Sequence, residues 1–160
     1  MRNSFSQKNI FIALGSNIGE REKNCEAAVA RFRGRGQITV AAISSWYETK
    51  AECLPGETQP DFVNGVVALE TTLTPEELHQ VCKEIEKSIG RTFSKKRWQP
   101  RLIDLDILFF GDQILKTETL TIPHPLLHKR RFVLEPLAEI AADFVHPVLK
   151  KRVAELLKVC

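Results

Sequence analysis

The sequence predicts an α+β fold in which helices pack on an antiparallel sheet, and three observations lead to that class. Strand-like and helix-like patterns follow one another as strand, helix, strand, strand, helix, strand over residues 9–110. Glycine or proline punctuates the boundaries between them. The chain has 160 residues, of which 43% are hydrophobic and 27% charged, as is typical of a folded domain with one core. We therefore expect residues 1–160 to form a single domain.

The first strand and the first helix are predicted from the N-terminal fifth of the chain. Residues 9–15 are a short apolar run that ends at glycine, which is typical of a buried strand. Residues 16–19 supply a turn. Apolar side chains then recur at the spacing of one helical face, at Cys25, Ala28, Val29 and Phe32. Gly34 and Gly36 are expected to end this helix.

Two long strands are predicted next. Residues 38–49 are rich in β-branched and aromatic side chains, and residues 62–71 form a second run of the same kind. We expect the two to pair as an antiparallel ribbon. The loop between them, residues 50–61, is long, and long loops in compact domains commonly carry function.

The second helix carries signals at both ends. Thr74 is an N-cap, Pro75 suits the first turn, and Glu77 stands in the capping-box position. Gly90 ends the helix. Its buried stripe is expected to be Leu78, Val81, Cys82, Ile85 and Ile89.

Residues 104–110 predict the last strand of the sheet. The resulting order, β-α-β-β-α-β, is that of a ferredoxin-like sheet with helices packed on it. After residue 120 several prolines and short helical patterns predict a C-terminal helical extension.

The charge distribution points either to an anionic ligand or to a solvated loop. The net charge is only +3, but residues 81–160 carry 15 basic and 10 acidic side chains. Residues 91–101 have no acidic side chain, and their basic ones are Arg91, Lys95, Lys96, Arg97 and Arg101. Trp98 lies inside this basic loop, where a purely solvated segment seldom has a large aromatic side chain. The cluster alone does not decide between the two interpretations.

Asp104 and Asp106 form the most informative pair. Alternate residues of a strand share a face and lie roughly 6–7 Å apart. Two neighbouring carboxylates in an apolar strand repel each other and are costly to desolvate, so a positive charge must compensate. That charge is either the basic loop or a divalent metal such as magnesium. Magnesium binds carboxylate oxygens and usually takes further oxygen ligands from the phosphates of a substrate. Structural salt bridges are the alternative, but an acid pair beside a basic loop favours phosphoryl transfer.

Three other side chains leave their roles open. His124 stands between two prolines and shortly before a run of basic residues. It is either a structural histidine or a phosphate contact. From the residues alone, Phe62 and Phe132 are expected to lie in the core.

The cysteines and the N-terminus exclude several classes. Cysteines at 25, 53, 82 and 160 form no C-x-x-C pair and join no histidine cluster, which disfavours a zinc site and a disulfide framework. Cys25 and Cys82 are expected in the core, and Cys160 is expected to be exposed. No apolar run approaches the roughly 18 residues of a membrane span, and the N-terminus lacks a signal-peptide core. We therefore expect a cytoplasmic protein.

Separated segments carry a resemblance to a known enzyme family. The most specific is RWQPRLIDLDIL, residues 97–108. The others are ALGSNIG (13–19), SSWYET (44–49), QPDFVN (59–64), IPHP (122–125) and RRFVLEPL (130–137). In this order and over nearly the whole chain they resemble the 6-hydroxymethyl-7,8-dihydropterin pyrophosphokinases of folate biosynthesis.

The resemblance implies an ATP-dependent transfer of pyrophosphate to the hydroxymethyl group of the pterin, with release of AMP. Asp104 and Asp106 match the family's aspartates, which bind two Mg²⁺ ions. Arg91 and Arg101 match the arginines that hold the triphosphate, so these four are the implied catalytic residues. Further implied ATP-binding positions are Lys95, Trp98, the main chain near Ile107, Thr121, His124 and Arg130.

The resemblance also implies a pterin site. Phe62 and Phe132 match the aromatic side chains that stack on the two faces of the ring, and Asn64 matches the side chain that reads its edge. Thr49 lies where the family's backbone completes this recognition. Trp98 matches a loop residue that closes over the bound substrates.

The chain departs from the family pattern at Lys50, Phe93 and Gln99, where proline, a second arginine and glycine are common.

Two other functions are disfavoured by the sequence. A ferredoxin-like nucleic-acid-binding module would use the basic loop on phosphates and Trp98 on a base, but the paired carboxylates would repel the backbone. A pterin-binding protein without catalysis is disfavoured by the intact aspartates and arginines. We expect ATP and the pterin as small-molecule substrates, with no nucleic acid, membrane or obligate protein partner.

Overall fold

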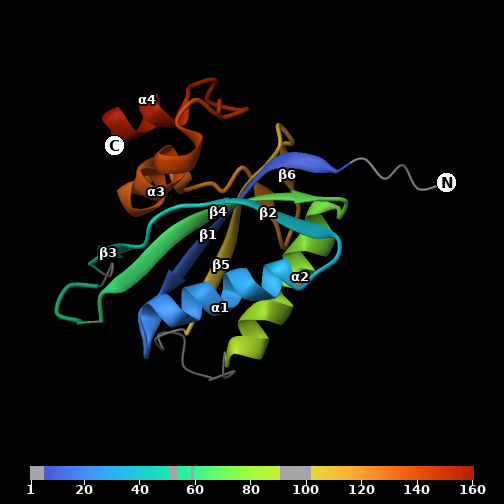
Figure 1. Ribbon diagram of the computed structural model, residues 1–160. Coiled ribbons are helices and arrows are strands. Elements are labelled where there is room, and N and C mark those ends of the chain that lie inside the picture. The colour runs from blue at the N-terminus through green and yellow to red at the C-terminus, as the bar shows by residue number, and fades with distance from the viewer. Residues whose placement is uncertain (1–5, 51–53, 59, 91–101) are drawn as a thin grey trace.

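The computed structural model describes residues 6–50, 54–58, 60–90 and 102–160 of the chain. Figure 1 shows the elements in chain order. The first part of the chain forms β1 (Gln7–Ser16), α1 (Arg21–Arg33), β2 (Ile38–Ile43), β3 (Tyr47–Thr49), β4 (Phe62–Thr71), α2 (Pro75–Ile89) and β5 (Asp104–Phe110). The rest forms β6 (Leu115–Lys116), β7 (Thr121–Ile122), a 3₁₀ turn (Leu127–Lys129), α3 (Arg131–Ala141) and α4 (Val153–Lys158).

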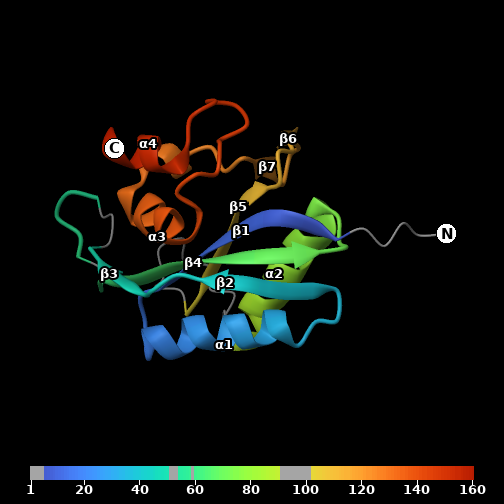
Figure 2. The ribbon, with the colours of Figure 1, turned by 45° about the horizontal axis from the view of Figure 1, so that its top comes forward.

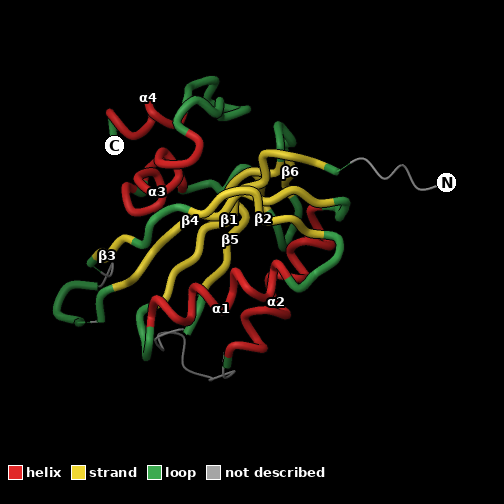
Figure 3. Tube along the Cα trace, in the orientation of Figure 1, coloured by secondary structure: helices red, strands yellow, loops and turns green. Residues whose placement is uncertain are grey.

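The main sheet has the strand order β2-β4-β1-β5, with β3 also paired to β4 (Figure 3). The pairing of neighbouring strands is antiparallel. The strand order follows from two helical crossovers. Helix α1 connects β1 to β2, which have β4 between them, and α2 connects β4 to β5, which have β1 between them. The α+β fold predicted from the sequence is confirmed, and the strand order agrees with a ferredoxin-like sheet. β6 and β7 form a separate small hairpin.

The prediction of one continuous strand over residues 38–49 is wrong, because β2 and β3 are separate strands. At Ser44 a side-chain hydroxyl replaces a backbone acceptor, since its Oγ accepts the Val66 N–H at 2.9 Å. The next side chain but one, Trp46, lies over Gly65, where an added β-carbon would stand 2.4 Å from the indole ring. The hydroxyl and the indole together interrupt the regular pairing.

Helices α1 and α2 cover one face of the sheet (Figure 2). The predicted core face of α1 is buried throughout, and so is the predicted stripe of α2 except for the half-buried Ile89. The capping box of α2 is present, with Thr74 and Glu77 exchanging hydrogen bonds of 3.1 and 3.2 Å. Gly90 ends the helix with φ at 111°, a left-handed conformation that glycine adopts without strain.

One residue of α2 was not expected to be buried. Glu86 is only 2% exposed, and its carboxylate accepts the backbone N–H of Leu105 at 3.0 Å. Its other oxygen lies 3.3 Å from Nζ of Lys83. The carboxylate therefore ties α2 to β5 beside the two aspartates of that strand.

The C-terminal extension covers part of the opposite face of the sheet, where α3 and α4 lie across from α1 and α2 (Figure 2). A second hydrophobic cluster forms there, separate from the cluster under α1 and α2. Its buried members are Phe11, Val66, Leu108, Phe109, Leu127, Val133, Leu134, Leu137, Val153 and Leu156. The sheet is thus packed on both faces, although only partly on this one.

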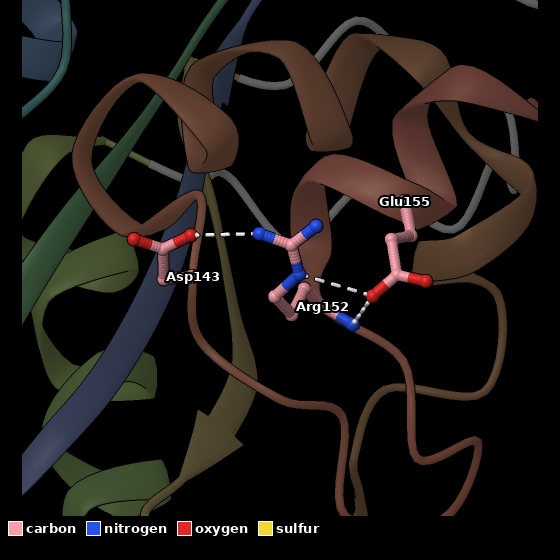
Figure 4. A network of polar contacts seen from close by, with 3 residues as sticks. All are labelled: Asp143, Arg152 and Glu155. Carbon is pink, nitrogen blue, oxygen red and sulfur yellow. Dashed lines mark hydrogen bonds and ion pairs between the residues drawn. The ribbon is translucent and has the colours of Figure 1, made fainter.

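Polar contacts link the segment just after α3 to the start of α4 (Figure 4). The guanidinium of Arg152 lies 3.1 Å from Asp143 through Nη1 and 3.1 Å from Glu155 through Nε. Exposed ion pairs of this kind contribute little to stability. The buried Val153 and Leu156 therefore provide most of the attachment.

Candidate active site

Four strands place a row of residues on the sheet face opposite α1 and α2. The antiparallel register sets Asn64 of β4 opposite Gly15 of β1, and Gly15 opposite Asp104 of β5. Tyr47 of β3 continues the row as the partner of Asn64. Directly opposed residues project from the same face, and neighbouring strands are about 4.8 Å apart. Asn64 and Asp104 therefore flank Gly15, with roughly 10 Å between their backbones.

Asp106 lies one step further along the same face of β5. It is paired with Ala13 of β1, which packs with the cluster under α3 and α4. Leu105, between the two aspartates, projects to the other face and is buried there. Asp104 is half-buried and Asp106 is exposed. Both carboxylates thus occupy one face, as alternate residues of a strand are expected to do.

Gly15 leaves the middle of the row without a side chain. A β-carbon at this position would lie 3.0 Å from Oδ1 of Asn64 and 3.6 Å from the ring of Phe62. The amide nitrogen of Asn64 donates to Oγ1 of Thr49 at 2.5 Å. Asn64 and Phe62 therefore pack against the buried Gly15, and Thr49 is joined to them through Asn64, so three residues predicted from the sequence are brought together.

The C-terminal extension brings two further predicted residues near each other. Phe132 lies in the first turn of α3 and is half-buried. The guanidinium of Arg130 is 5.6 Å from the centroid of its ring, which is within the range of a cation–π contact. Phe62 is also half-buried, so both aromatic side chains are more exposed than the core position first expected for them.

His124 is attached to the outer edge of β5. Its backbone N–H donates to the carbonyl oxygen of Leu108 at 3.0 Å. Burial lowers the pKa of the imidazole, the carboxylate of Asp106 raises it, and the charge of Arg130 lowers it again. The net effect lowers the pKa, which favours the neutral form of the ring.

The remaining predicted positions lie in different places. Ile107 has its side chain in the core and its main chain on β5, at one end of the strand order. Thr121 is half-buried on β7. Four predicted residues lie outside the described part of the chain: Arg91, Lys95, Trp98 and Arg101.

Sequence reasoning missed two features of this face. Gly15 was interpreted only as the end of a strand, although it stands in the ALGSNIG segment that carries part of the family resemblance. Tyr47 was not singled out, and its hydroxyl donates to Glu139 of α3 at 2.5 Å. Neither role has a local signal, because the first depends on which strands pair and the second on where α3 packs.

A family model described as 7,8-dihydro-6-hydroxymethylpterin-pyrophosphokinase (HPPK) matches residues 11–142. The chain belongs to this family. Among curated relatives, the 2-amino-4-hydroxy-6-hydroxymethyldihydropteridine pyrophosphokinase of Synechocystis is 44% identical over 147 residues, which cover 92% of this chain and 73% of the relative. The enzyme of the same name from Bacillus subtilis is 46% identical over 130 residues, which cover 81% and 76%.

Solved structures of longer chains share the fold of this HPPK family member. A crystal structure of an HPPK-DHPS in complex with substrates superposes with a TM-score of 0.75 over 97% of this chain and 43% of that chain, at 14% identity. Wild-type HPPK-DHPS of Plasmodium falciparum gives a TM-score of 0.71 over 97% and 45%, at 16% identity. At such identities the likeness concerns the fold alone.

Membership in the HPPK family settles the kind of chemistry. The chain is a pyrophosphokinase of folate biosynthesis, with ATP as the co-substrate and a hydroxymethyldihydropterin as the acceptor. The nucleic-acid-binding alternative is not favoured. Within the described ranges, no helix combines the length and the apolar character needed to cross a bilayer.

Proposed function

We propose that the face formed by Tyr47, Asn64, Gly15, Asp104 and Asp106 is where this chain transfers pyrophosphate. The pterin would lie at the Asn64 end, and the phosphates of ATP would lie at the Asp104 end. The proposal is carried by the register of the sheet, which places the amide of Asn64 on one side of Gly15 and the carboxylate of Asp104 on the other. An acceptor hydroxyl and a phosphate chain need such a short distance between their binding groups.

At the pterin end, Phe62 from β4 and Phe132 from α3 would stack on the two faces of the ring. Both are half-buried, which leaves part of each ring surface for a ligand. Stacking of this kind adds about 0.5–1.5 kcal/mol per aromatic pair beyond the burial of surface. Asn64 would read the polar edge of the pterin, held in orientation by its hydrogen bond to Thr49.

At the phosphate end, Asp104 and Asp106 would hold two Mg²⁺ ions. The donor set fits magnesium, because that ion is commonly bound through one or two carboxylates with substrate phosphates and water completing its shell. Over the described ranges, no larger group of His, Cys, Asp and Glu side chains gathers that could hold a metal ion. When bound, the ions would neutralise the phosphate charge and polarise the transferred group.

The chain's own side chains would act by positioning. We propose that Arg91, Arg101 and Lys95 hold the triphosphate, and that His124, Arg130, Thr121 and the main chain at Ile107 bind the rest of the nucleotide, with Trp98 closing over both substrates. The hydroxymethyl oxygen would then form a bond to the β-phosphorus as its proton passes to water. The bond from that phosphorus to the oxygen bridging to the α-phosphorus would break, and AMP would leave with the electron pair. Fixing the two reactants in line supplies much of the acceleration.

We further propose that residues 1–160 act as one domain and that the enzyme works in the cytoplasm. The first is supported by two hydrophobic clusters that share a single sheet. The second is supported by the use of ATP as a co-substrate.

The test is to incubate the protein with Mg²⁺, ATP and 6-hydroxymethyl-7,8-dihydropterin and to separate the nucleotides by chromatography. AMP should form only when the pterin and Mg²⁺ are both present, whereas ADP would show transfer of a single phosphate and refute the mechanism. Asp106→Asn should lower turnover about 100-fold or more, as the loss of a transition-state charge contact does. Asp112→Asn, an exposed carboxylate just beyond β5, is the matched control and should retain activity.

A further inference from the structure

Glu139 connects α3 to β3 and to the residues just before it. One oxygen of its carboxylate accepts the backbone N–H of Ser45 at 2.9 Å and the hydroxyl of Ser45 at 2.7 Å. The other oxygen accepts the phenol of Tyr47 at 2.5 Å. A single side chain of the helix thus holds the strand through three hydrogen bonds.

Both ends of this contact lead to the proposed pterin site. On α3, Glu139 stands seven residues after Phe132, so the two lie on the same helical face about two turns apart. On the sheet, Tyr47 is the direct partner of Asn64, and Thr49 is the direct partner of Phe62. The contact therefore joins the helix that carries one proposed stacking ring to the strands that carry the other.

The charge states suit a strong contact. Hydrogen bonds from Tyr47 and Ser45 hold the pKa of the Glu139 carboxyl below its usual value. The hydrogen bond between Tyr47 and Glu139 also raises the pKa of the Tyr47 phenol. At neutral pH the pair is thus a carboxylate and a neutral phenol, and a charge-assisted hydrogen bond is stronger than a neutral one. The neighbouring Glu135 is engaged within the helix instead, 2.6 Å from Arg131.

We propose that Glu139 is a positioning residue for the pterin. Through Tyr47 and Ser45 it sets how far the first turn of α3 stands from β4, and so sets the width of the slot between Phe132 and Phe62. Stacked rings prefer centroid separations of about 4.5–7 Å, so a shift of α3 by an ångström would weaken the contact on one face of the ring. Glu139 has this role only if the pterin lies where it is placed above.

The test measures the affinity for each substrate separately. Dissociation constants are obtained by titrating 6-hydroxymethyl-7,8-dihydropterin in the presence of Mg²⁺ and α,β-methylene-ATP, and by titrating α,β-methylene-ATP alone with Mg²⁺. Glu139→Ala should weaken the pterin about tenfold, because hydrogen bonds to a charged group contribute more than neutral ones and water competes at this exposed site. The affinity for the nucleotide should stay within twofold. Glu139→Gln, which keeps one acceptor oxygen, should lose less, and Glu135→Ala is the matched control on the same helix.

A double-mutant cycle with Phe132 distinguishes positioning from general damage. Once Phe132→Ala has removed the ring, adding Glu139→Ala should cause no further loss of pterin affinity, although the two side chains are two turns apart. Additive losses, or equal losses for both substrates, would overturn the inference and show a merely structural role. If Phe132→Ala itself leaves pterin binding unchanged, the placement of the pterin is wrong and the inference fails with it. If Phe132→Ala weakens the pterin and Glu139→Ala does not, only the inference fails.

Discussion

Replacing Gly15 by alanine tests whether the space between Asn64 and Asp104 is the floor of the active site. The added β-carbon would stand 3.0 Å from Oδ1 of Asn64 and 3.6 Å from the Phe62 ring. The first of these contacts is tighter than ordinary packing, so the amide of Asn64 must move by a few tenths of an ångström. That amide is also tied to Thr49, so the movement would spread to the pterin end of the site.

The fold should tolerate this change. Gly15 is not among the residues with positive φ, so alanine fits its backbone. Losing a glycine also restricts the unfolded chain, which stabilises a protein by about 0.4–1 kcal/mol and offsets the crowding at Asn64. We expect the free energy of unfolding to stay within about 1 kcal/mol of the wild type. The value of kcat/KM for the pterin should fall about 10- to 100-fold, because small misplacements of reactants have effects of that size.

The assay is the rate of AMP formation against pterin concentration, with urea unfolding of the same preparation. Gly65→Ala is the contrasting variant, because its β-carbon would stand 2.4 Å from the ring of Trp46. Overpacking of that kind costs about 1–3 kcal/mol, so stability should fall in this variant. A folded Gly15→Ala enzyme with kcat/KM within twofold of the wild type would show that nothing binds over this part of the sheet.

Other perturbations separate the site from the core. Phe132→Ala is expected to weaken pterin binding about tenfold while ATP binding is retained, and equal losses in the two titrations would refute a stacking role. Glu86→Ala removes the buried acceptor of a β5 backbone N–H and should lower the free energy of unfolding by about 1–3 kcal/mol, whereas Glu84→Ala on the exposed side should lower it by less than about 1 kcal/mol. Burial raises the pKa of the Cys25 thiol to about 12, so iodoacetamide at pH 8 should leave it unmodified in the folded protein while the exposed Cys160 is alkylated. Mass spectrometry locates the label, and comparable labelling of both cysteines would contradict the burial of the first.

The elements that the sequence predicted well are those set by neighbouring residues. The capping box at Thr74 and the terminal Gly90 define α2 almost residue by residue, because caps act within one turn. The shared face of Asp104 and Asp106 likewise follows from the two-residue period of a strand. The break between β2 and β3 was missed because it depends on Ser44, which bonds to a strand more than twenty residues away.

Local sequence patterns could not predict the arrangement of the candidate site either, because it also depends on contacts between distant parts of the chain. Asn64, Gly15 and Asp104 meet only because β4 and β5 pair on either side of β1, and no window of sequence contains all three strands. The C-terminal extension was expected to be helical, but its position on the second face depends on the apolar cluster around Phe109. The strand pattern singled out Asp104 and Asp106, the family resemblance proposed the other candidate residues, and their spatial relation came from the sheet.

The alternation along β1 has a consequence for how such a chain can change in evolution. Ile10, Ile12 and Leu14 project into the core beneath the helices, while Ala13 and Gly15 belong to the other face, where they are paired with Asp106 and Asp104 of β5. Alternate residues of β1 are therefore under different constraints. One set must fill the volume of the core, and the other must leave room for a ligand. Among relatives we expect the positions of Ile10, Ile12 and Leu14 to vary among aliphatic side chains. We expect the positions of Ala13 and Gly15 to keep small residues even where the neighbouring sequence differs.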